Sequence, residues 1–346
     1  MFFGLSDDAR SLAAGVHDLL TDACPPDVVR AAWPGGDPSA VDKLWAALGD
    51  LGLFGLLVPE STGGLGLDDL VTVAALQQCG YAGVPGPLVE TVAVAAPLLS
   101  AGDALPAGLL EGSVRVAVQR DARDANGTGP LVPYAAASTH VLQLPGPQPA
   151  GSRPRLLPVD DLSVTPVATT DGSRAAARIT AAETGTGLAL DVGPADVASA
   201  RHRGVLGTAA YLVGLSRRML DLTVSYVSNR TQFGVAIGSF QAVQHPLADA
   251  LVAVEFAEPV VLRAAQSLVD DDPATGIHVA MAKALASDAA TQATRATLQA
   301  HGAMGYTVEY DLHLFAKRAW ALAADWGSAA EHRATITRTL LPEETP

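Results

Sequence analysis

The sequence predicts a mainly α-helical α+β fold in three parts. We expect an N-terminal helical domain at residues 1–111, a small β domain at 112–198 and a C-terminal four-helix bundle at 199–346. Three observations predict it. Apolar residues recur at steps of three and four in the first part and again in the last, which is the spacing of one helix face. Between them, short β-type stretches alternate with glycine and proline, which is typical of a small sheet domain.

The first part is rich in alanine and leucine. Within residues 43–55, apolar side chains recur at steps of four, three and three: Leu44, Leu48, Leu51 and Phe54. This spacing predicts a helix with one buried face. Residues 58–66 then carry a proline and three glycines, which no regular helix accommodates. Asp68 and Asp69 supply a cap for a second helix that begins at about Leu70.

Helical periodicity fades after residue 112. Val114–Val118 and Val141–Leu144 have the composition of short strands, and turn residues separate them. We therefore expect a small, irregular β domain.

The last part carries two long helical stripes. The first runs at steps of three and four: Leu212, Leu215, Met219, Leu222 and Tyr226. The second continues over seven steps: Val243, Leu247, Ala250, Val254, Ala257, Val261, Ala264 and Leu268. Such stripes predict helices packed near-antiparallel in a bundle. The alternative for each stripe is a face that contacts a partner, and both hold if the bundle oligomerises. Pro246 and Pro259 lie within the second stripe, so we expect that helix to kink or to be interrupted.

Composition excludes several classes of protein. The net charge is −14 and Lys and Arg do not cluster, so nucleic-acid binding is not predicted. No apolar run is long enough for a membrane span, and the acidic N-terminus does not have the pattern of a signal peptide. Two cysteines, Cys24 and Cys79, give no disulfide framework and no metal-ligand spacing. We expect a cytoplasmic protein without a metal site.

Two clusters are unusual for plain core or plain surface. Arg230–Gly234, followed by Phe240 and Gln241, lies in a short break between two helices, where a guanidinium and several amides could bind an anion. The alternative is an ordinary turn with a salt bridge. The second cluster is Gln299–Tyr306, in which Gly302 and Gly305 allow close approach of a ligand or neighbour. The alternative there is a glycine helix cap.

Together these segments resemble the acyl-CoA dehydrogenase family over most of the chain. Residues 51–66 resemble its N-terminal signature, and Arg230–Gly234 with Gln241 resembles its R-x-x-F-G…Q segment. Gln299–Tyr306 resembles its Q-x-x-G-G-x-G-Y segment, with Ala303 replacing the second glycine. The resemblance implies the three-part fold above, assembled as a dimer of dimers.

The resemblance also implies a chemistry. In that family a carboxylate removes the α-proton of a CoA thioester, FAD accepts the β-hydride, and an electron-transfer flavoprotein is the expected electron acceptor. Residues of the two C-terminal segments contact the ADP part of an FAD that the neighbouring subunit mainly binds. Carried over to this chain, the cofactor-binding residues are Arg230, Gln232, Phe233, Gly234, Gln241, Gln299, Gly302 and Gly305.

The sequence departs from the family at the catalytic base. The usual Glu position falls on Trp326, whose indole cannot accept a proton, so no catalytic residue stands there. Asp325 is the adjacent candidate, and the alternative for it is a solvent-facing acid. The family's second position for the Glu falls on residues 201–205, which contain no carboxylate. The T-E-P-x-x-G-S-D stretch that lines the flavin ring is also missing.

Three hypotheses follow. The one we favour is a base-deficient subunit of a heteromeric acyl-CoA dehydrogenase, in a heterotetramer with a homologous subunit that carries the Glu and shares the FAD. Heteromeric members of the family act on CoA thioesters of steroid side chains. The second hypothesis is a self-sufficient homotetramer with Asp325 or Glu331 as the base. The third is a flavin-free structural relative.

Overall fold

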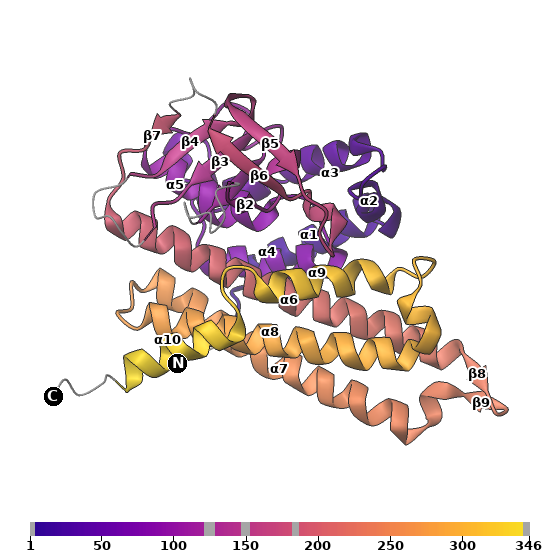
Figure 1. Ribbon diagram of the computed structural model, residues 1–346. Helices are drawn as coiled ribbons and strands as arrows, with labels where there is room; N and C mark the ends of the chain where they lie inside the picture. The colour runs from indigo at the N-terminus through magenta and orange to yellow at the C-terminus, as the bar shows by residue number, and fades with distance from the viewer. Residues whose placement is uncertain (1–3, 121–128, 147–152, 182–186, 342–346) are drawn as a thin grey trace. The chain divides into compact units, whose positions relative to one another are not determined.

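The computed structural model describes residues 4–120, 129–146, 153–181 and 187–341. They form two compact units. The bundle unit combines residues of 1–22, 69–83 and 205–346, and the sheet unit combines 23–68 and 84–204. Helical segments, a small strand region and a long helical C-terminal part follow one another along the chain, which confirms the predicted fold class (Figure 1). The boundaries of the three predicted domains stay a prediction.

The sheet unit begins with helices. They are α2 (Pro26–Ala31), α3 (Pro38–Asp50), the short 3-10 turns η1 (Leu53–Gly55) and η2 (Glu60–Thr62), the π-helical segment η3 (Glu90–Ala95) and α5 (Ala96–Ala101). Trp45 on α3 stacks on Phe54 at 4.9 Å between ring centroids, and its Nε1 donates to the Pro85 carbonyl at 2.9 Å. The predicted helix is confirmed with Leu44 and Leu48 on its buried face, but it ends at Asp50, so Phe54 lies in the separate turn η1. The irregular stretch that was expected after it is also present.

Within the described residues, seven short strands follow in the same unit: β1 (Val116–Gln119), β2 (Leu131–Val132), β3 (His140–Gln143), β4 (Arg155–Pro158), β5 (Leu162–Pro166), β6 (Ala177–Ala181) and β7 (Leu188–Ala189). One sheet has the order β1-β3-β4-β7 and the other β2-β6-β5. The strands β1 and β3 are parallel, with Val116 opposite His140, and β3 and β4 are antiparallel. Small apolar side chains, among them Ala117, Val141 and Ile179, fill the core.

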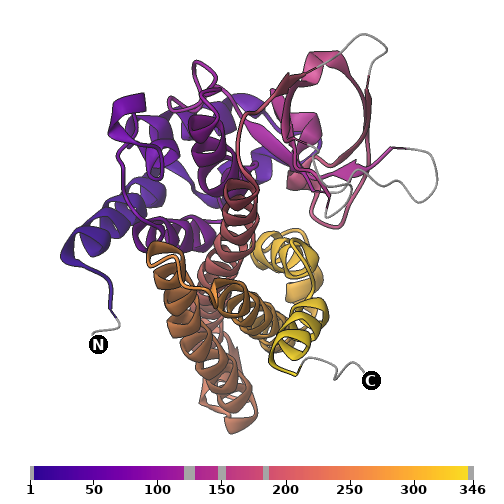
Figure 2. The same cartoon turned by 90° about the vertical axis from the view of Figure 1, so that its left-hand side faces the viewer.

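The bundle unit consists of helices. They are α1 (Asp7–Ala23), α4 (Asp69–Ala82), the bundle part of α6 (Pro194–Asn229), α7 (Gln241–Val269), α8 (Thr275–His301), α9 (Leu312–Ala324) and α10 (Ala329–Leu340). The helices α7 and α8 lie side by side in both views (Figures 1 and 2). Nowhere in the described ranges is a helix long and apolar enough to cross a membrane.

The predicted stripe on α7 is the buried face of that helix. Its fully or nearly fully buried members are Leu247, Ala250, Val254, Ala257, Val261 and Ala264. The helix runs without interruption through Pro246 and Pro259, so the interruption, one of the two outcomes expected there, does not occur. Each proline removes one backbone donor, but packing of the continuous apolar stripe holds the helix together across both positions.

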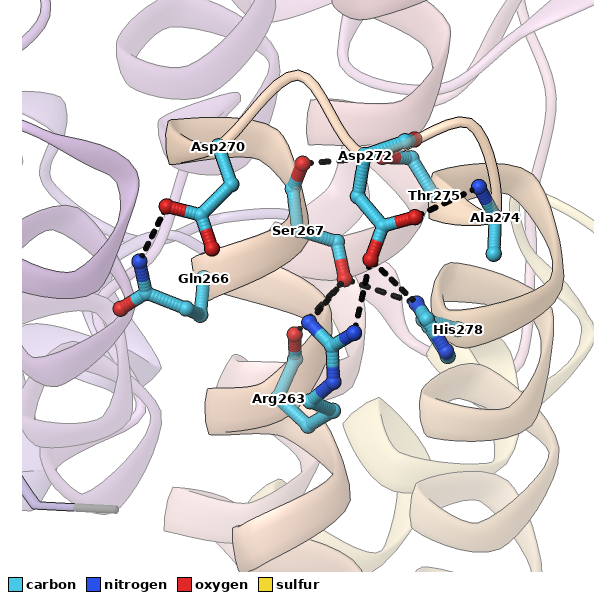
Figure 3. A network of polar contacts seen from close by, with 8 residues as sticks. All are labelled: Arg263, Gln266, Ser267, Asp270, Asp272, Ala274, Thr275 and His278. Carbon is cyan, nitrogen blue, oxygen red and sulfur yellow. Dashed lines mark hydrogen bonds and ion pairs between the residues drawn. The ribbon is translucent and has the colours of Figure 1, made fainter. Parts of the chain in front are cut away.

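A polar network fixes the turn between the C-terminal end of α7 and the start of α8 (Figure 3). Arg263 donates to Ser267 Oγ at 2.8 Å and to Asp272 Oδ2 at 2.7 Å, and Ser267 Oγ lies 2.8 Å from His278 Nδ1. The backbone N–H of Ala274 donates to Asp272 Oδ1 at 2.8 Å. This backbone bond, followed by the bond from Arg263, lowers the pKa of Asp272, so the carboxylate stays charged in the network.

Candidate functional site

The Arg230 cluster forms a two-stranded hairpin between α6 and α7. Its strands β8 (Thr231–Gln232) and β9 (Val235–Ala236) are antiparallel, with Gln232 opposite Val235. Phe233 and Gly234 connect them with φ of 52° and 82°. Positive φ at both positions is what a type I′ turn requires. Glycine adopts this conformation freely, whereas phenylalanine adopts it at a cost.

The hairpin presents a cation and an aromatic ring to its surroundings. Phe233 is 93% exposed, and its ring contacts Phe240 edge-on at 6.3 Å. The Arg230 guanidinium is exposed and forms no hydrogen bond or ion pair with any residue that the structure describes. Its backbone is fixed, because its N–H donates to the Tyr226 carbonyl at 2.9 Å and its carbonyl accepts from Ile237 at 2.8 Å. The alternative of a turn held by a salt bridge of Arg230 is therefore not observed.

Some amide side chains of the hairpin region are held by local hydrogen bonds, and one is accessible. Gln232 Nε2 donates to the Thr231 carbonyl at 2.8 Å, and Gln244 Nε2 donates to the Gly238 carbonyl at 2.8 Å. Gln241 is the exposed first residue of α7. Local hydrogen bonds therefore hold the hairpin and the 3-10 turn η7 (Ile237–Ser239), while the Gln241 side chain stays accessible.

The Gln299 cluster lies at the C-terminal end of α8. Gln299 is exposed, and the 3-10 segment η8 (Gly302–Tyr306) follows the helix directly. Gly302 is the C-cap residue, with φ of 58° and open space where a Cβ would be. A Cβ on Gly305 would lie 3.2 Å from the Leu298 carbonyl oxygen. The predicted helix cap is thus present, and Gly302 also leaves room for close approach from outside.

Three aromatic rings join the two clusters. His301 stacks on Tyr226 at 4.2 Å and lies 4.8 Å from Tyr310, between ring centroids. Tyr226 accepts the Arg230 N–H, and His301 directly precedes Gly302. Both sequence-predicted clusters therefore lie at the same end of the bundle unit.

His301 is the buried member of this trio. Its Nδ1 lies 2.9 Å from the Thr297 carbonyl, and because a carbonyl only accepts, Nδ1 carries the proton. Its Nε2 is buried without a partner among the described residues. Burial lowers the pKa of His301, so the ring is neutral near pH 7.

A polar groove lies between α7 and α8 and includes Gln299. Its volume is about 690 Å³, and it is lined by Pro246, Asp249, Asp288, Thr291, Gln292, Arg295, Ala296 and Gln299. Sequence reasoning missed the groove. The available signal was the spacing of Gln292, Arg295 and Gln299 at steps of three and four, which places three polar side chains on one helix face.

The residues that the resemblance places at the base position, Asp325 and Trp326, lie just after α9. Trp326 and Asp325 are each only 6% exposed, and Asp325 Oδ1 accepts the Trp326 N–H at 2.9 Å. Trp326 has φ of 54° and Gly327 has φ of 97°, so the backbone turns sharply here. Asp325 is therefore a buried carboxyl and not a solvent-facing one.

A fully buried lysine caps the C-terminal end of α9, and sequence reasoning missed it. Lys283 Nζ on α8 donates to Ser287 Oγ at 3.0 Å, to the Ala323 carbonyl at 3.1 Å and to the Gly327 carbonyl at 3.0 Å. A cation at a helix C-terminus is favourable for the dipole and satisfies the last carbonyls. Lys283 thereby holds the segment that carries Asp325 and Trp326.

The other acidic candidate is a helix cap. Glu331 forms a capping box with Ser328 at the start of α10. The hydrogen bond that the Ser328 N–H donates to the Glu331 carboxylate lowers the pKa of Glu331. The Glu331 side chain is exposed. A carboxylate stabilised in its charged form is a weak base, so this geometry disfavours Glu331 in that role.

Residues 201–205, which the resemblance places at the second position for the Glu, lie on α6. There Arg201 donates to the Pro145 carbonyl at 2.5 Å. Burial lowers the pKa of the neighbouring His202. Across the described ranges, no group of three or more His, Cys, Asp or Glu side chains is arranged to hold a metal ion.

Comparison with known proteins identifies related chains. Residues 6–104 match the model of the acyl-CoA dehydrogenase N-terminal domain, and residues 196–341 match that of the C-terminal domain. Acyl-CoA dehydrogenase IpdE2 of Mycobacterium tuberculosis is 33% identical over 317 residues, which cover 90% of this chain and 91% of that protein.

Solved structures share the fold. A chain of the ChsE4–ChsE5 complex from Mycobacterium tuberculosis matches with a TM-score of 0.84 at 24% identity, over the full length of both chains. A variant of the Tcur3481–Tcur3483 steroid ACAD matches with a TM-score of 0.77 at 24% identity, over 96% of this chain and 98% of that one.

Proposed function

This chain belongs to the acyl-CoA dehydrogenase family, and on that premise we propose that it is the base-deficient subunit of a heteromeric, FAD-dependent enzyme. A homologous subunit carries the catalytic Glu and most of the flavin site. The two subunits form a heterotetramer, a dimer of dimers. This chain contributes contacts to the ADP part of the shared FAD.

The hairpin is the observation that carries the proposal. An exposed guanidinium that forms no bond within the described part of its own chain matches the phosphates of a dinucleotide, since Arg binds phosphate oxygens in pairs. The almost fully exposed Phe233 ring supplies an apolar contact beside it, and Gly302 leaves open space at the end of α8. These donors and spaces fit the nucleotide half of FAD.

The catalytic position supports the base-deficient part of the proposal. Bound FAD supplies the acceptor for the β-hydride of an acyl-CoA. The α-proton needs a carboxylate, and the nitrogen lone pair of Trp326 belongs to the aromatic system of the indole. Trp326 therefore fills the position without taking a proton, and Lys283 holds the segment in place. Proton removal is assigned to the partner subunit.

The proposed substrate is a CoA thioester of a steroid side chain, with an electron-transfer flavoprotein as electron acceptor. Two structural relatives support this choice, because one is a complex of two different proteins and the other is a steroid ACAD. The sequence departures at the base position agree with a division of roles between subunits.

The test is FAD retention by the co-expressed complex. Arg230→Gln removes charge-assisted hydrogen bonds worth about 1.5–3 kcal/mol, so the dissociation constant of FAD should rise roughly 10- to 100-fold. Arg338→Gln on α10 is the matched control, because Arg338 is exposed and, among the described residues, its side chain bonds within its own helix. Equal FAD retention in the Arg230 variant and the wild type would overturn the proposal.

A second candidate function is a self-sufficient homotetramer that uses Asp325. The burial of Asp325 favours it, because a catalytic base works best where bulk water is excluded. The hydrogen bond from Trp326 disfavours it, because that bond occupies one oxygen of the carboxylate. This candidate requires turnover by the chain alone, abolished in Asp325→Asn. A flavin-free relative would instead show no flavin absorbance even in the complex.

A further inference from the structure

Another pocket lies within the sheet unit, on one face of the sheet β1-β3-β4-β7. Side chains that are neighbours across strands line it. His140 of β3 lies opposite Pro158 of β4, and one step along the same face Leu156 lies opposite Leu188 of β7. The turn of residues 104–106, which follows α5, forms another wall. We call this the sheet pocket, and its volume of about 570 Å³ is in the range of small-molecule sites.

The walls of the sheet pocket are mainly apolar. Leu156 is 5% exposed, whereas Leu188 is 54% exposed, so the exposed part of the wall is on β7, the edge strand of the sheet. Leu105 and Pro106 add apolar surface from the turn. Such walls favour a ligand with an apolar body, because binding removes its apolar surface from water.

The hydrogen bonds of His140 fix its tautomer. Its Nδ1 lies 3.0 Å from Thr139 Oγ1. The Thr139 hydroxyl donates to the Arg115 carbonyl at 3.0 Å, so it has no proton left for His140, and Nδ1 must donate to Oγ1. Burial lowers the pKa of His140, so the ring is neutral near pH 7 and Nε2 keeps a lone pair. Nε2 forms no hydrogen bond with any residue in the described ranges and is available as an acceptor.

Asp161 is the other polar side chain among the described residues that line the sheet pocket. Its carboxylate is exposed and forms no hydrogen bond or ion pair with the described part of the chain. Asp160 precedes it and adds a second negative charge near His140. No Lys or Arg is found in the described lining. The sheet pocket therefore offers two side-chain acceptors, one of them charged, and no cation to hold an anion.

We propose that the sheet pocket binds a small molecule that has an apolar body and a primary ammonium head. An ammonium has three N–H donors, so one head group can donate both to His140 Nε2 and to the Asp161 carboxylate, whose charge is opposite to its own. An alcohol has one donor and no charge. A carboxylate or a phosphate is repelled by Asp161. Acyl-CoA and FAD are anions, so the inference concerns a different ligand and does not rest on the proposed function.

The test titrates the full chain with probes that share one alkyl chain and differ in the head group. They are hexylammonium, hexanol and hexanoate, and binding is measured by calorimetry at neutral pH. Hexylammonium should bind about fivefold more tightly than hexanol, because the exposed carboxylate adds one screened ion contact. Hexanoate should bind more weakly than hexanol.

Two variants separate the contributions of the acceptors. Asp161→Asn removes the charge and keeps the shape, so hexylammonium should bind about as weakly as hexanol does. His140→Phe keeps an aromatic ring and removes Nε2, so both probes should bind about fivefold more weakly. Asp50→Asn, at the exposed end of α3 and outside the lining, is the matched control and should bind like the wild type.

The outcomes are distinct from those of the proposed function. Hexylammonium that binds no more tightly than hexanoate, or equally well to the wild type and to Asp161→Asn, would overturn the inference. Asp161 is exposed, so this variant should unfold at the wild-type temperature and decides the question even if His140→Phe folds poorly. A loss of the preference for hexylammonium over hexanol in Asp161→Asn alone supports it. FAD retention by the complex should be unchanged in these variants.

Discussion

Replacing Phe233 by asparagine should leave the isolated chain as stable as before or slightly more stable. A left-handed backbone costs a side-chain-bearing residue roughly 1–2 kcal/mol, and asparagine before Gly234 suits a type I′ turn. The lost edge-on contact with Phe240 is worth about 0.5–1.5 kcal/mol. The ring is 93% exposed, so almost no apolar burial is lost. The net change in the free energy of unfolding should lie within about 1 kcal/mol of zero.

The same substitution should weaken FAD retention by the complex. If the exposed ring packs on the cofactor or on the partner beside it, losing about 1 kcal/mol of contact raises the dissociation constant roughly fivefold. The assays are denaturant unfolding of the chain alone and FAD titration of the stripped complex. Gly234→Ala is the matched control, since it adds about 1 kcal/mol of backbone strain at φ of 82° and leaves the ring in place.

Two results would refute this reasoning. A loss of more than about 2 kcal/mol of stability in Phe233→Asn would mean that the ring is a structural element of the hairpin. Unchanged FAD retention would mean that the exposed ring serves neither cofactor nor partner. We predict the reverse pattern, in which Phe233→Asn keeps its free energy of unfolding and the complex retains less FAD.

Three further predictions concern stability. Lys283→Met should lower the free energy of unfolding, measured by urea titration, by about 3 kcal/mol, because the Ala323 and Gly327 carbonyls lose their donor. The control Lys43→Met, at an exposed position, should change the free energy of unfolding little. Glu331→Ala should cost about 1 kcal/mol through the lost capping box and leave turnover of the complex intact; loss of turnover would instead make it the base. In the folded protein, burial lowers the pKa of His301 below its ordinary value of about 6.5. The contribution of His301 to the free energy of unfolding is therefore fully present above about pH 6.5 and is lost as the pH falls toward the pKa of the folded state. His301→Phe should flatten this acid-side fall in melting temperature, and an unchanged pH profile would contradict it.

Periodicity predicted the helices well because it reports burial directly. The stripe on α7 coincides with the buried face from Leu247 to Ala264, and the Gly-rich break after Asn229 is a hairpin. The interruption that was one expectation at Pro246 and Pro259 does not occur, for a physical reason. Their local cost is fixed, but the packing of a long apolar face exceeds it.

The candidate site was only partly predictable from sequence. Arg230 and Gln299 stand out as motif residues, yet the groove depends on how residues far apart in sequence, such as Pro246 and Gln299, come together when α7 and α8 pack. In the sequence, Lys283 is a single lysine in an alanine-rich helix and carries no sign of its burial. The tertiary structure shows that it is fully buried against the end of α9. Likewise the burial of Asp325 follows from the turn after Ala324, which no spacing rule indicates.

Flavin absorbance tests the central claim most directly. The chain is purified alone and, in parallel, with a homologous subunit that carries the catalytic Glu, and both samples are scanned in the visible range and assayed for acyl-CoA oxidation. We predict a nearly colourless, inactive chain alone and a yellow, active complex. A chain that by itself holds one FAD per subunit and oxidises acyl-CoA would contradict the account.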